Sequence, residues 1–128
     1  MEVLTTHGIQ ISVECLYQMR YSEPISGKQL FNYTIIIENK SSWTVKLMRR
    51  HWYIFDSLNG VQEVEGEGVV GQQPVLAPGE QFQYSSWCPL VSEVGRMNGI
   101  YLMERLPDGL PFEVIIPPFV LISDPKKN

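Results

Sequence analysis

The stretch Gly66-Glu67-Gly68-Val69-Val70-Gly71 has the spacing G-x-G-x-x-G, and the residues that follow it decide the class of fold. In a dinucleotide-binding fold, this spacing ends a strand, makes a tight turn and opens a helix whose N-terminus holds pyrophosphate. Here the chain continues as Gln72-Gln73-Pro74-Val75-Leu76-Ala77-Pro78-Gly79-Glu80. Two prolines and a further glycine cannot propagate a helix. The motif is therefore either a glycine-rich loop of a β protein or a phosphate cradle of another design.

Apolar and polar side chains alternate with a period of two on both sides of this stretch, which is typical of half-buried strands. No window free of Gly and Pro has the apolar spacing of an amphipathic helix. The Asn59-Gly60 pair between two such segments predicts a β-hairpin. A change of apolar parity in the third segment predicts a bulge near Arg49-Arg50-His51. The expected strands cover residues 9–14, 31–38, 44–56, 61–64, 81–86, 97–103, 112–116 and 119–122, with Pro117-Pro118 interrupting the last pair.

Seven or eight short strands separated by turn signals indicate an all-β fold, an antiparallel two-sheet β-sandwich of the immunoglobulin or fibronectin type III kind. The 128 residues are enough for one domain, so we expect a single domain over residues 1–128. Its ordered core is expected at about residues 5–122, with residues 1–6 and 124–128 as loose ends.

Composition excludes several classes of function. The formal net charge of −4 disfavours a binder of nucleic acid or anionic membranes, which needs a basic face. The N-terminal residues lack the basic and apolar regions of a signal peptide, and no apolar run approaches the ~18 residues of a membrane span. These features predict a cytoplasmic protein. In a reducing cytoplasm, Cys15 and Cys88 are expected to be free, buried thiols.

Four short blocks occur in a characteristic order: Arg50-His51-Trp52, Val61-Gln62-Glu63-Val64 leading into residues 66–71, Leu76-Ala77-Pro78-Gly79-Glu80, and Ile116-Pro117-Pro118-Phe119. Together they resemble the signature of the ApaG family over roughly residues 5 to 122. The resemblance implies a fibronectin-type sandwich, found as a small bacterial protein and as a domain of eukaryotic F-box and polymerase-associated proteins. It further implies a protein-interaction module, linked in bacteria to cobalt and magnesium tolerance.

The glycine motif has two interpretations. It can be a turn that needs positive φ and tight packing. It can also be a nest of backbone N–H groups that holds phosphate without a helix dipole, and the ApaG resemblance implies such a pyrophosphate role. Glu63, Glu65 and Glu67 would repel a phosphate there, so this second hypothesis requires Mg²⁺ or nearby basic residues. The candidate loop and rim are Gly66, Glu67, Gly68, Val69, Val70, Gly71, Arg49, Arg50 and His51.

The sequence gives less support to metal binding and to catalysis. His51, Glu63, Glu65 and Glu67 could hold a divalent ion, but we favour a solvated acidic edge that blocks sheet-to-sheet aggregation, and we expect no metal site. The sequence has no nucleophile elbow, no zinc-protease motif and no recognisable pair of catalytic carboxylates, so we expect no enzymatic activity.

The sequence therefore favours a non-enzymatic binding module, with a protein partner or a second copy of the chain as its ligand. Ile36, Trp87, Ile100 and Leu102 fall on the solvent parity of their strands, and exposed apolar side chains of this kind mark interaction surfaces. The alternative is that loops cover part of both sandwich faces. The alternative function is Mg²⁺-dependent binding of phosphate, pyrophosphate or a nucleotide by residues 66–71.

Overall fold

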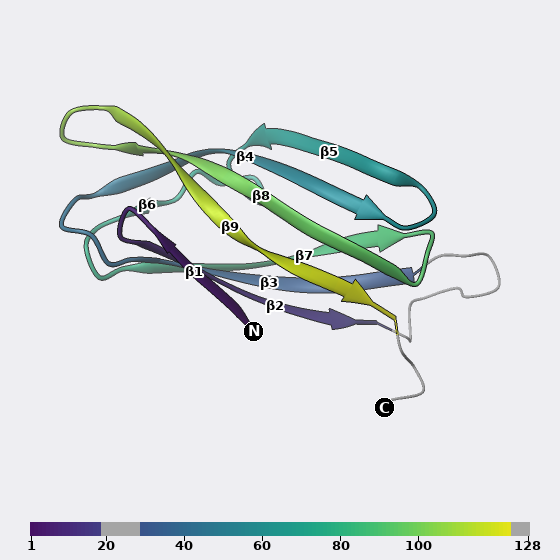
Figure 1. Ribbon diagram of the computed structural model, residues 1–128. Coiled ribbons are helices and arrows are strands. Elements are labelled where there is room, and N and C mark those ends of the chain that lie inside the picture. Colours follow the sequence, from purple (N-terminus) through teal and green to yellow (C-terminus); the bar gives the residue numbers. More distant parts are fainter. Residues whose placement is uncertain (19–28, 124–128) are drawn as a thin grey trace.

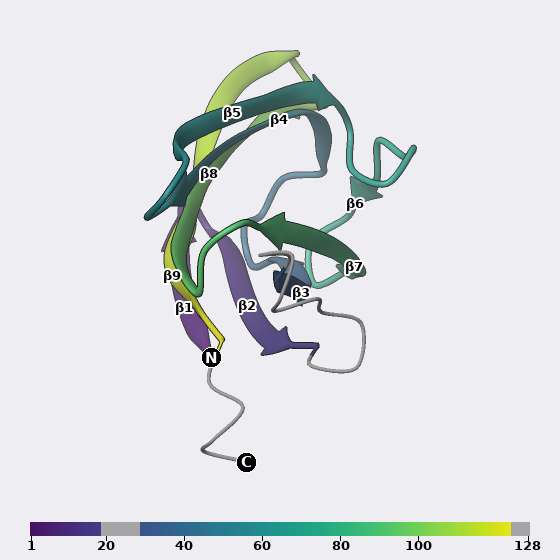
Figure 2. The same cartoon turned by 90° about the vertical axis from the view of Figure 1, so that its right-hand side faces the viewer.

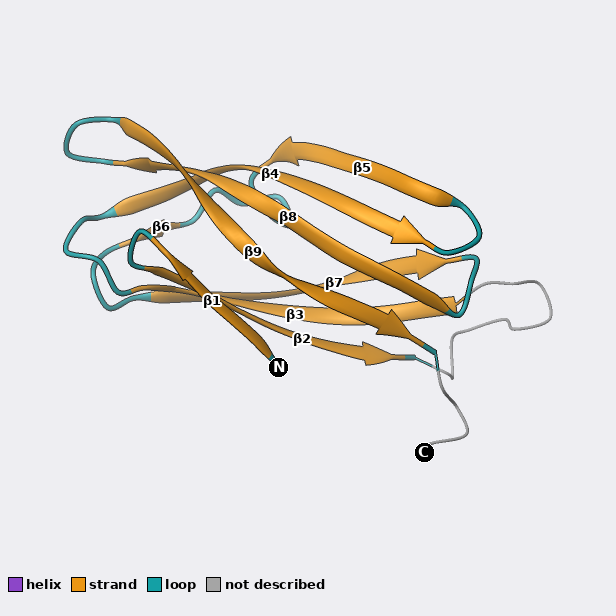
Figure 3. Cartoon of the chain, viewed as in Figure 1, coloured by secondary structure: helices purple, strands orange, loops and turns teal. Residues whose placement is uncertain are grey.

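The computed structural model describes residues 1–18 and 29–123, which form nine strands and no helix (Figure 3). Accordingly, no helix in this part of the chain could cross a bilayer. The strands are β1 (Glu2–Thr6), β2 (Ile9–Tyr17), β3 (Gln29–Asn39), β4 (Val45–Asp56), β5 (Gly60–Glu67), β6 (Val75–Leu76), β7 (Gln81–Leu90), β8 (Val94–Arg105) and β9 (Leu110–Ile122).

The strands build two antiparallel sheets that pack face to face as two layers (Figure 1). One sheet has the order β1-β2-β3-β7, and the other has the order β5-β4-β8-β9, with the short β6 paired to β4. The predicted antiparallel two-sheet sandwich is therefore confirmed.

The core lies between the sheets and is made by alternate residues of each strand, as the period-two pattern predicts. In β3, every second residue from Phe31 to Ile37 is buried, and in β2 Ile9, Ile11 and Val13 are buried. The opposite sheet contributes Trp52 and Tyr101, whose rings meet edge to face. Buried apolar area of this kind supplies most of the stabilisation of a small domain.

Three features differ from the prediction. The residues expected to be a loose N-terminal end form β1, which pairs along its whole length with β2 through a tight His7-Gly8 turn. The last expected pair of strands is one continuous β9, in which Pro117-Pro118 coincides with a register shift opposite β8. Proline is tolerated there because β9 is the edge of its sheet. The bulge in β4 lies at Met48, between Leu47 and Arg49, one residue before its expected position. The expected loose end at residues 124–128 lies outside the described residues.

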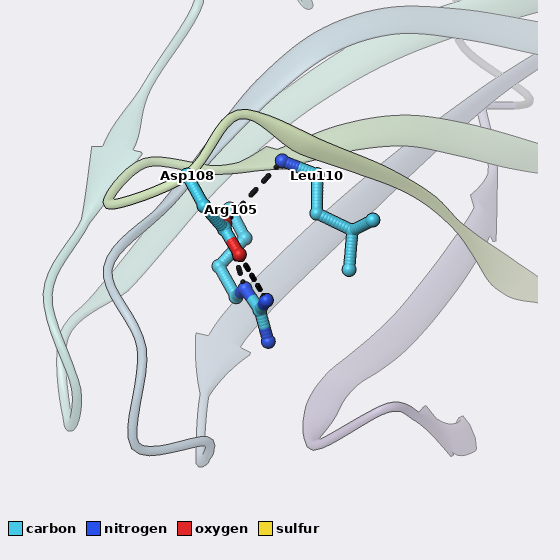
Figure 4. Close-up of polar contacts among 3 residues, drawn as sticks. All are labelled: Arg105, Asp108 and Leu110. Carbon is cyan, nitrogen blue, oxygen red and sulfur yellow. Dashed lines mark hydrogen bonds and ion pairs between the residues drawn. The ribbon is translucent and has the colours of Figure 1, made fainter.

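Turn chemistry fixes two hairpins. Gly60, with φ of 77°, begins β5 opposite Asp56 and confirms the hairpin predicted at Asn59-Gly60. In the β8–β9 hairpin, the Arg105 guanidinium pairs with the Asp108 carboxylate, which also accepts a 3.4 Å hydrogen bond from the Leu110 amide (Figure 4). The same guanidinium lies over the ring of Trp43, with its carbon 4.4 Å from the ring centroid.

The two sides of the sandwich are unequal. On one side, β9 lies against β1 and β2 and covers the gap between the layers. On the other side stand β5 and β7, each the terminal strand of its sheet, and the chain that follows β5 turns down beside β6 there (Figure 2). The glycine motif therefore lies at the side of the sandwich where the two sheet edges face each other.

Candidate functional site

The second half of the glycine motif is a two-residue β-turn. Val69 and Gln72 exchange both backbone hydrogen bonds, at 2.8 and 2.9 Å, and Val70 and Gly71 between them have φ of 42° and 80°. Positive φ at both central residues is the mark of a type I′ turn. A β-branched residue at positive φ is a genuine outlier, so Val70 holds a strained backbone at the tip of the loop.

Gly68 is required for the loop to close. Its φ is 61°, and a β-carbon built on it would lie 2.1 Å from the carbonyl oxygen of Gln72. The Gly68 amide donates to the Met48 carbonyl at 2.9 Å, which fastens the loop to the bulge of β4. The amides of Gly68, Val69 and Gln72 are thus already bonded to protein carbonyls, and a phosphate nest would depend on other amides of the turn.

Arg50 reaches the loop from β4. Its Nη1 donates to the carbonyl oxygens of Glu67 and Gly68, both at 3.0 Å. Among the described residues, no carboxylate lies within 4 Å of its guanidinium, in contrast to the paired Arg105. The half-buried guanidinium of Arg50 therefore carries a charge that the described part of the fold does not neutralise.

Strand alternation separates the three basic residues that the sequence grouped as one rim. Arg50 shares the inward parity of the buried Trp52, whereas Arg49 and His51 lie on the outer face of the same strand. His51 is there clasped by two exposed carboxylates, with Nε2 at 2.8 Å from Glu63 and Nδ1 at 3.1 Å from Glu65. Only Arg50 of the three is brought to the same side as Val69 and Val70.

His51, Glu63 and Glu65 also form a group that brings one ligand atom from each within 4.8 Å of the others. A metal ion would have to displace at least one of the two existing contacts of the imidazole, because each ring nitrogen already faces a carboxylate oxygen. The His51 ring is further held by stacking on Tyr53, with centroids 4.5 Å apart. The group lies on the outer face of the sheet, away from the glycine turn.

Between β5 and β7, a cavity of about 340 Å³ opens between the two sheets. We call it the edge slot. Aromatic and aliphatic side chains form most of its lining. Among the described lining residues, Arg50 is the single charged one. Two residues of the glycine turn line the slot: Val69, which is buried, and Val70, which is exposed. The lining comprises Tyr33, Arg50, Trp52, Ile54, Gln62, Val64, Val69, Val70, Tyr84, Ser86, Trp87, Cys88, Pro89 and Met97.

The edge slot continues into a second cavity of about 570 Å³ towards the β4–β5 hairpin. Ile54, Gln62 and Pro89 line both cavities. The second cavity ends near Asp56, whose carboxylate is occupied by the amides of Val91 at 2.7 Å and Leu58 at 3.1 Å. The two cavities therefore adjoin each other along the open side of the sandwich, and we refer to them together as the groove.

The polar groups of the slot are held in their protonated forms. Burial raises the pKa of the Tyr84 phenol above its ordinary value, although a hydrogen bond with Tyr101 opposes this effect. Burial also raises the pKa of the Cys88 thiol to about 12. Such groups are hydrogen-bond donors and apolar surface at neutral pH, and neither is an activated nucleophile.

The apolar residues expected on the solvent side do not form one cluster. Ile36 and Trp87 belong to one sheet, and Ile100 and Leu102 to the other. Trp87 is 51% exposed, whereas the other three are half-buried. Of the four, Trp87 alone lines the edge slot among the described residues.

The sequence pattern did not reveal the slot. Tyr33, Trp52 and Tyr84 have inward parity, and parity alone does not tell a sealed interior from the lining of an open edge. One signal was present: an arginine at an inward position, two residues before a buried tryptophan. A charged residue on a core face points to a cavity, because charges are seldom buried without a partner.

Comparison with known proteins gives consistent relationships. Residues 19–105 match the family model described as the ApaG domain. Protein ApaG of Brucella canis is 48% identical over 116 residues, covering 91% of this chain and 88% of that protein. Protein ApaG of Bradyrhizobium sp. (strain ORS 278) is 43% identical over 123 residues, covering 96% and 94%. A crystal structure of a protein named ApaA from Bordetella pertussis superposes with a TM-score of 0.86 at 43% identity, covering 92% of this chain and 94% of its own. The chain belongs to the ApaG family.

Proposed function

We propose that this chain is a non-enzymatic binding module and that it holds a protein partner in the edge slot. The observation that carries the proposal is the open groove between the terminal strands β5 and β7, with an aromatic floor and a small number of polar groups. Concave sites lined by aromatic side chains and a few placed polar groups are where proteins bind ligands. The edges of sheets are also where extended segments of other proteins add.

Backbone strain in the lining of the slot supports the same proposal. Val70 has φ of 42°, although asparagine or glycine would adopt this conformation more easily, and its side chain is 52% exposed. Strain of this kind costs about 1–3 kcal/mol and clusters at functional sites. A strained, exposed valine beside an apolar groove is well placed to contact a bound chain.

The chemistry of the slot favours binding over catalysis. Its tyrosine and cysteine groups have raised pKa values, caused chiefly by burial. The two described histidines do not line it: His7 lies in the β1–β2 turn, and His51 lies on the outer face of β4. A nucleophile paired with a general base is the usual requirement for covalent catalysis, and the described slot residues offer no such pair.

A matched pair of substitutions in β7 tests the proposal. Ser86 lines the slot, and its neighbour Ser85 lies on the outer face, where its hydroxyl contacts that of Thr34 at 2.8 Å. Random peptides displayed on phage are selected on the wild-type chain, and the enriched peptides are then measured against both variants. Ser86→Phe should abolish binding by filling the slot, and Ser85→Phe should leave it unchanged.

Gln62→Trp provides a second way to fill the slot, from the opposite strand and at an exposed position, should Ser86→Phe unfold the chain. Thermal unfolding of each variant shows whether the fold persists. If folded Ser86→Phe and Gln62→Trp both bind the selected peptides as the wild type does, the slot is not the binding site and the proposal fails.

We extend the proposal to the other properties that the family suggests. Self-association through the slot would be a special case of protein binding, which size-exclusion chromatography of the same variants would reveal. The link of bacterial relatives with Co²⁺ and Mg²⁺ tolerance would then be an effect of the bound partner. The free thiols Cys15 and Cys88 suit a reducing compartment, which supports a cytoplasmic location.

Mg²⁺-dependent binding of pyrophosphate is the second candidate, and Arg50 beside the glycine turn is the observation that favours it. Against it, three amides of the loop are already bonded to carbonyls. Isothermal titration with pyrophosphate, with and without Mg²⁺, tests this candidate. Binding that needs Mg²⁺ and is lost in Arg50→Gln would support it, and an absence of heat at millimolar ligand would remove it.

A further inference from the structure

The charge of Arg50 suggests which kind of segment the slot takes. We infer that the edge slot binds an extended peptide segment with an acidic side chain, and that the Arg50 guanidinium receives its carboxylate. This inference rests on the proposed function and adds the chemistry of the partner. Two observations carry it: the unused donors of Arg50, and the charge of the slot lining.

Arg50 has hydrogen-bonding capacity left after its internal contacts. A guanidinium has five N–H donors, and Arg50 uses Nη1 for its bonds to the Glu67 and Gly68 carbonyls. Among the described residues, Nε and Nη2 have no hydrogen-bond acceptor. Because every buried side-chain nitrogen in this part of the chain has a hydrogen-bond partner, these two nitrogens are not fully buried. The unused donors are therefore accessible to a ligand. The internal bonds fix the group in place, so a ligand need not order it on binding.

The slot accepts a negative charge and does not repel it. Strand alternation turns Glu63, Glu65 and Glu67 to the outer face, and none of them lines the slot. The nearest carboxylate along the groove, that of Asp56, is engaged by backbone amides. One guanidinium over an aromatic floor complements one carboxylate. A phosphate dianion would be desolvated there with half its charge unmatched, which is unfavourable in an apolar site.

The register of β4 places Arg50 at one end of the groove, because Trp52, Ile54 and Asp56 follow it in turn towards the second cavity. A segment anchored at Arg50 can therefore run along the groove past Ile54. Apolar residues that follow the acid in this direction would meet Val64 first and Leu90 farther on.

The test uses the peptides selected on the wild-type chain, sequenced and then synthesised with blocked termini. We expect Asp or Glu at one fixed position, and we expect its replacement by Gln or Asn to weaken binding at least tenfold, as for a charged hydrogen bond in a partly dry site. Arg50→Gln should cause a similar loss. Arg49→Gln removes the same charge from the next residue, on the outer face, and should cause none.

These measurements distinguish failure of the acidic-peptide inference from failure of the proposed function. One outcome is that the selected peptides lose binding to Ser86→Phe and yet show no preference for an acidic residue and bind Arg50→Gln normally. That result would support the slot as the binding site and would overturn the inference that Arg50 receives a carboxylate. Selection that yields no peptide sensitive to Ser86→Phe would overturn both. The Glu→Gln peptide is measured on wild-type protein, so this arm holds even if Arg50→Gln loosens the loop. Displacement of the acidic peptide by equimolar pyrophosphate would assign Arg50 to phosphate instead.

Discussion

The guanidinium of Arg50 lies over Gly66 of the neighbouring strand, where a β-carbon would come within 2.9 Å of both Nη atoms. Gly66 and Arg50 are direct cross-strand partners in the β4–β5 ladder. Gly66 is not among the positive-φ glycines, so the small residue is needed for the side chain across from it. The first glycine of the motif therefore makes room for an arginine, and the second closes the loop.

This relationship predicts different results for the first two glycines. Gly66→Ala should change the free energy of unfolding by less than about 1 kcal/mol, because the obstructing atoms are the end of a flexible side chain. Gly68→Ala should cost about 2 kcal/mol or more, since its β-carbon meets the Gln72 carbonyl at 2.1 Å and its φ is positive. Urea unfolding measures both. Equal losses would show that the loop adapts more readily than its contacts indicate.

The strained turn gives a prediction of opposite sign. Val70→Gly should stabilise the chain by about 0.5–1 kcal/mol, because glycine adopts positive φ without steric cost. The same replacement at Val75, which is 50% exposed in β6 and lacks positive φ, should destabilise it. Thermal unfolding compares the two. If the slot binds a chain as proposed, Val70→Gly should also weaken peptide binding, and stabilisation without that loss would remove Val70 from the site.

The fold was predictable wherever one face of a strand is buried. In β3, the alternation of Phe31, Tyr33, Ile35 and Ile37 with polar neighbours gives both the strand and its inward face. β1 could not be found in this way, because all but the last of its residues are exposed and its pairing depends on the His7-Gly8 turn. The continuity of β9 through its prolines was hidden for a similar reason, since it depends on β9 being the last strand of its sheet, paired only with β8.

The candidate site was predictable only in part. The glycine motif identified the loop, and the sequence predicted that Arg50 lies near this loop. Grouping Arg49 and His51 with Arg50 ignored the alternation that places successive side chains on opposite faces of a strand. The slot itself depends on which strands end the two sheets, β5 and β7, and this is set by pairings between residues far apart in the sequence. No local pattern contains that information.

Asp56 predicts how stability responds to acid. Burial alone would raise the pKa of its carboxyl, but hydrogen bonds from Ser92, Val91 and Leu58 outweigh it, and the pKa lies below its ordinary value. The folded state thus binds fewer protons than the unfolded state, so the stabilisation is present above the unfolded pKa of about 3.9 and is lost as pH falls through the folded value. Asp56→Asn should lower stability at neutral pH by about 1–2 kcal/mol and flatten this acid dependence.

Asp108→Asn is the matched control for Asp56. Its carboxylate also has a lowered pKa, chiefly through its hydrogen bond with Arg105, but it lies on the exposed β8–β9 hairpin. Solvent screens an exposed pair of this kind, so the acid dependence of stability should remain nearly that of the wild type. Urea unfolding of both variants between neutral and acidic pH makes the comparison. An unchanged acid profile for Asp56→Asn would mean that another carboxyl governs the transition.

The thiols of Cys15 and Cys88 are expected to react slowly with alkylating reagents in the native state. Burial raises the pKa of Cys15 from 9.0 to about 11, and burial, together with nearby Cys15 and Asp56, raises that of Cys88 to about 12. Because the thiolate is the reactive form, a two-unit rise lowers its concentration near neutral pH about 100-fold. Iodoacetamide should therefore label neither residue rapidly in the native chain and both after unfolding. Cys15→Ser assigns the remaining label to Cys88. Rapid native labelling of Cys88 would show that the edge slot opens to its floor, since that residue lines it.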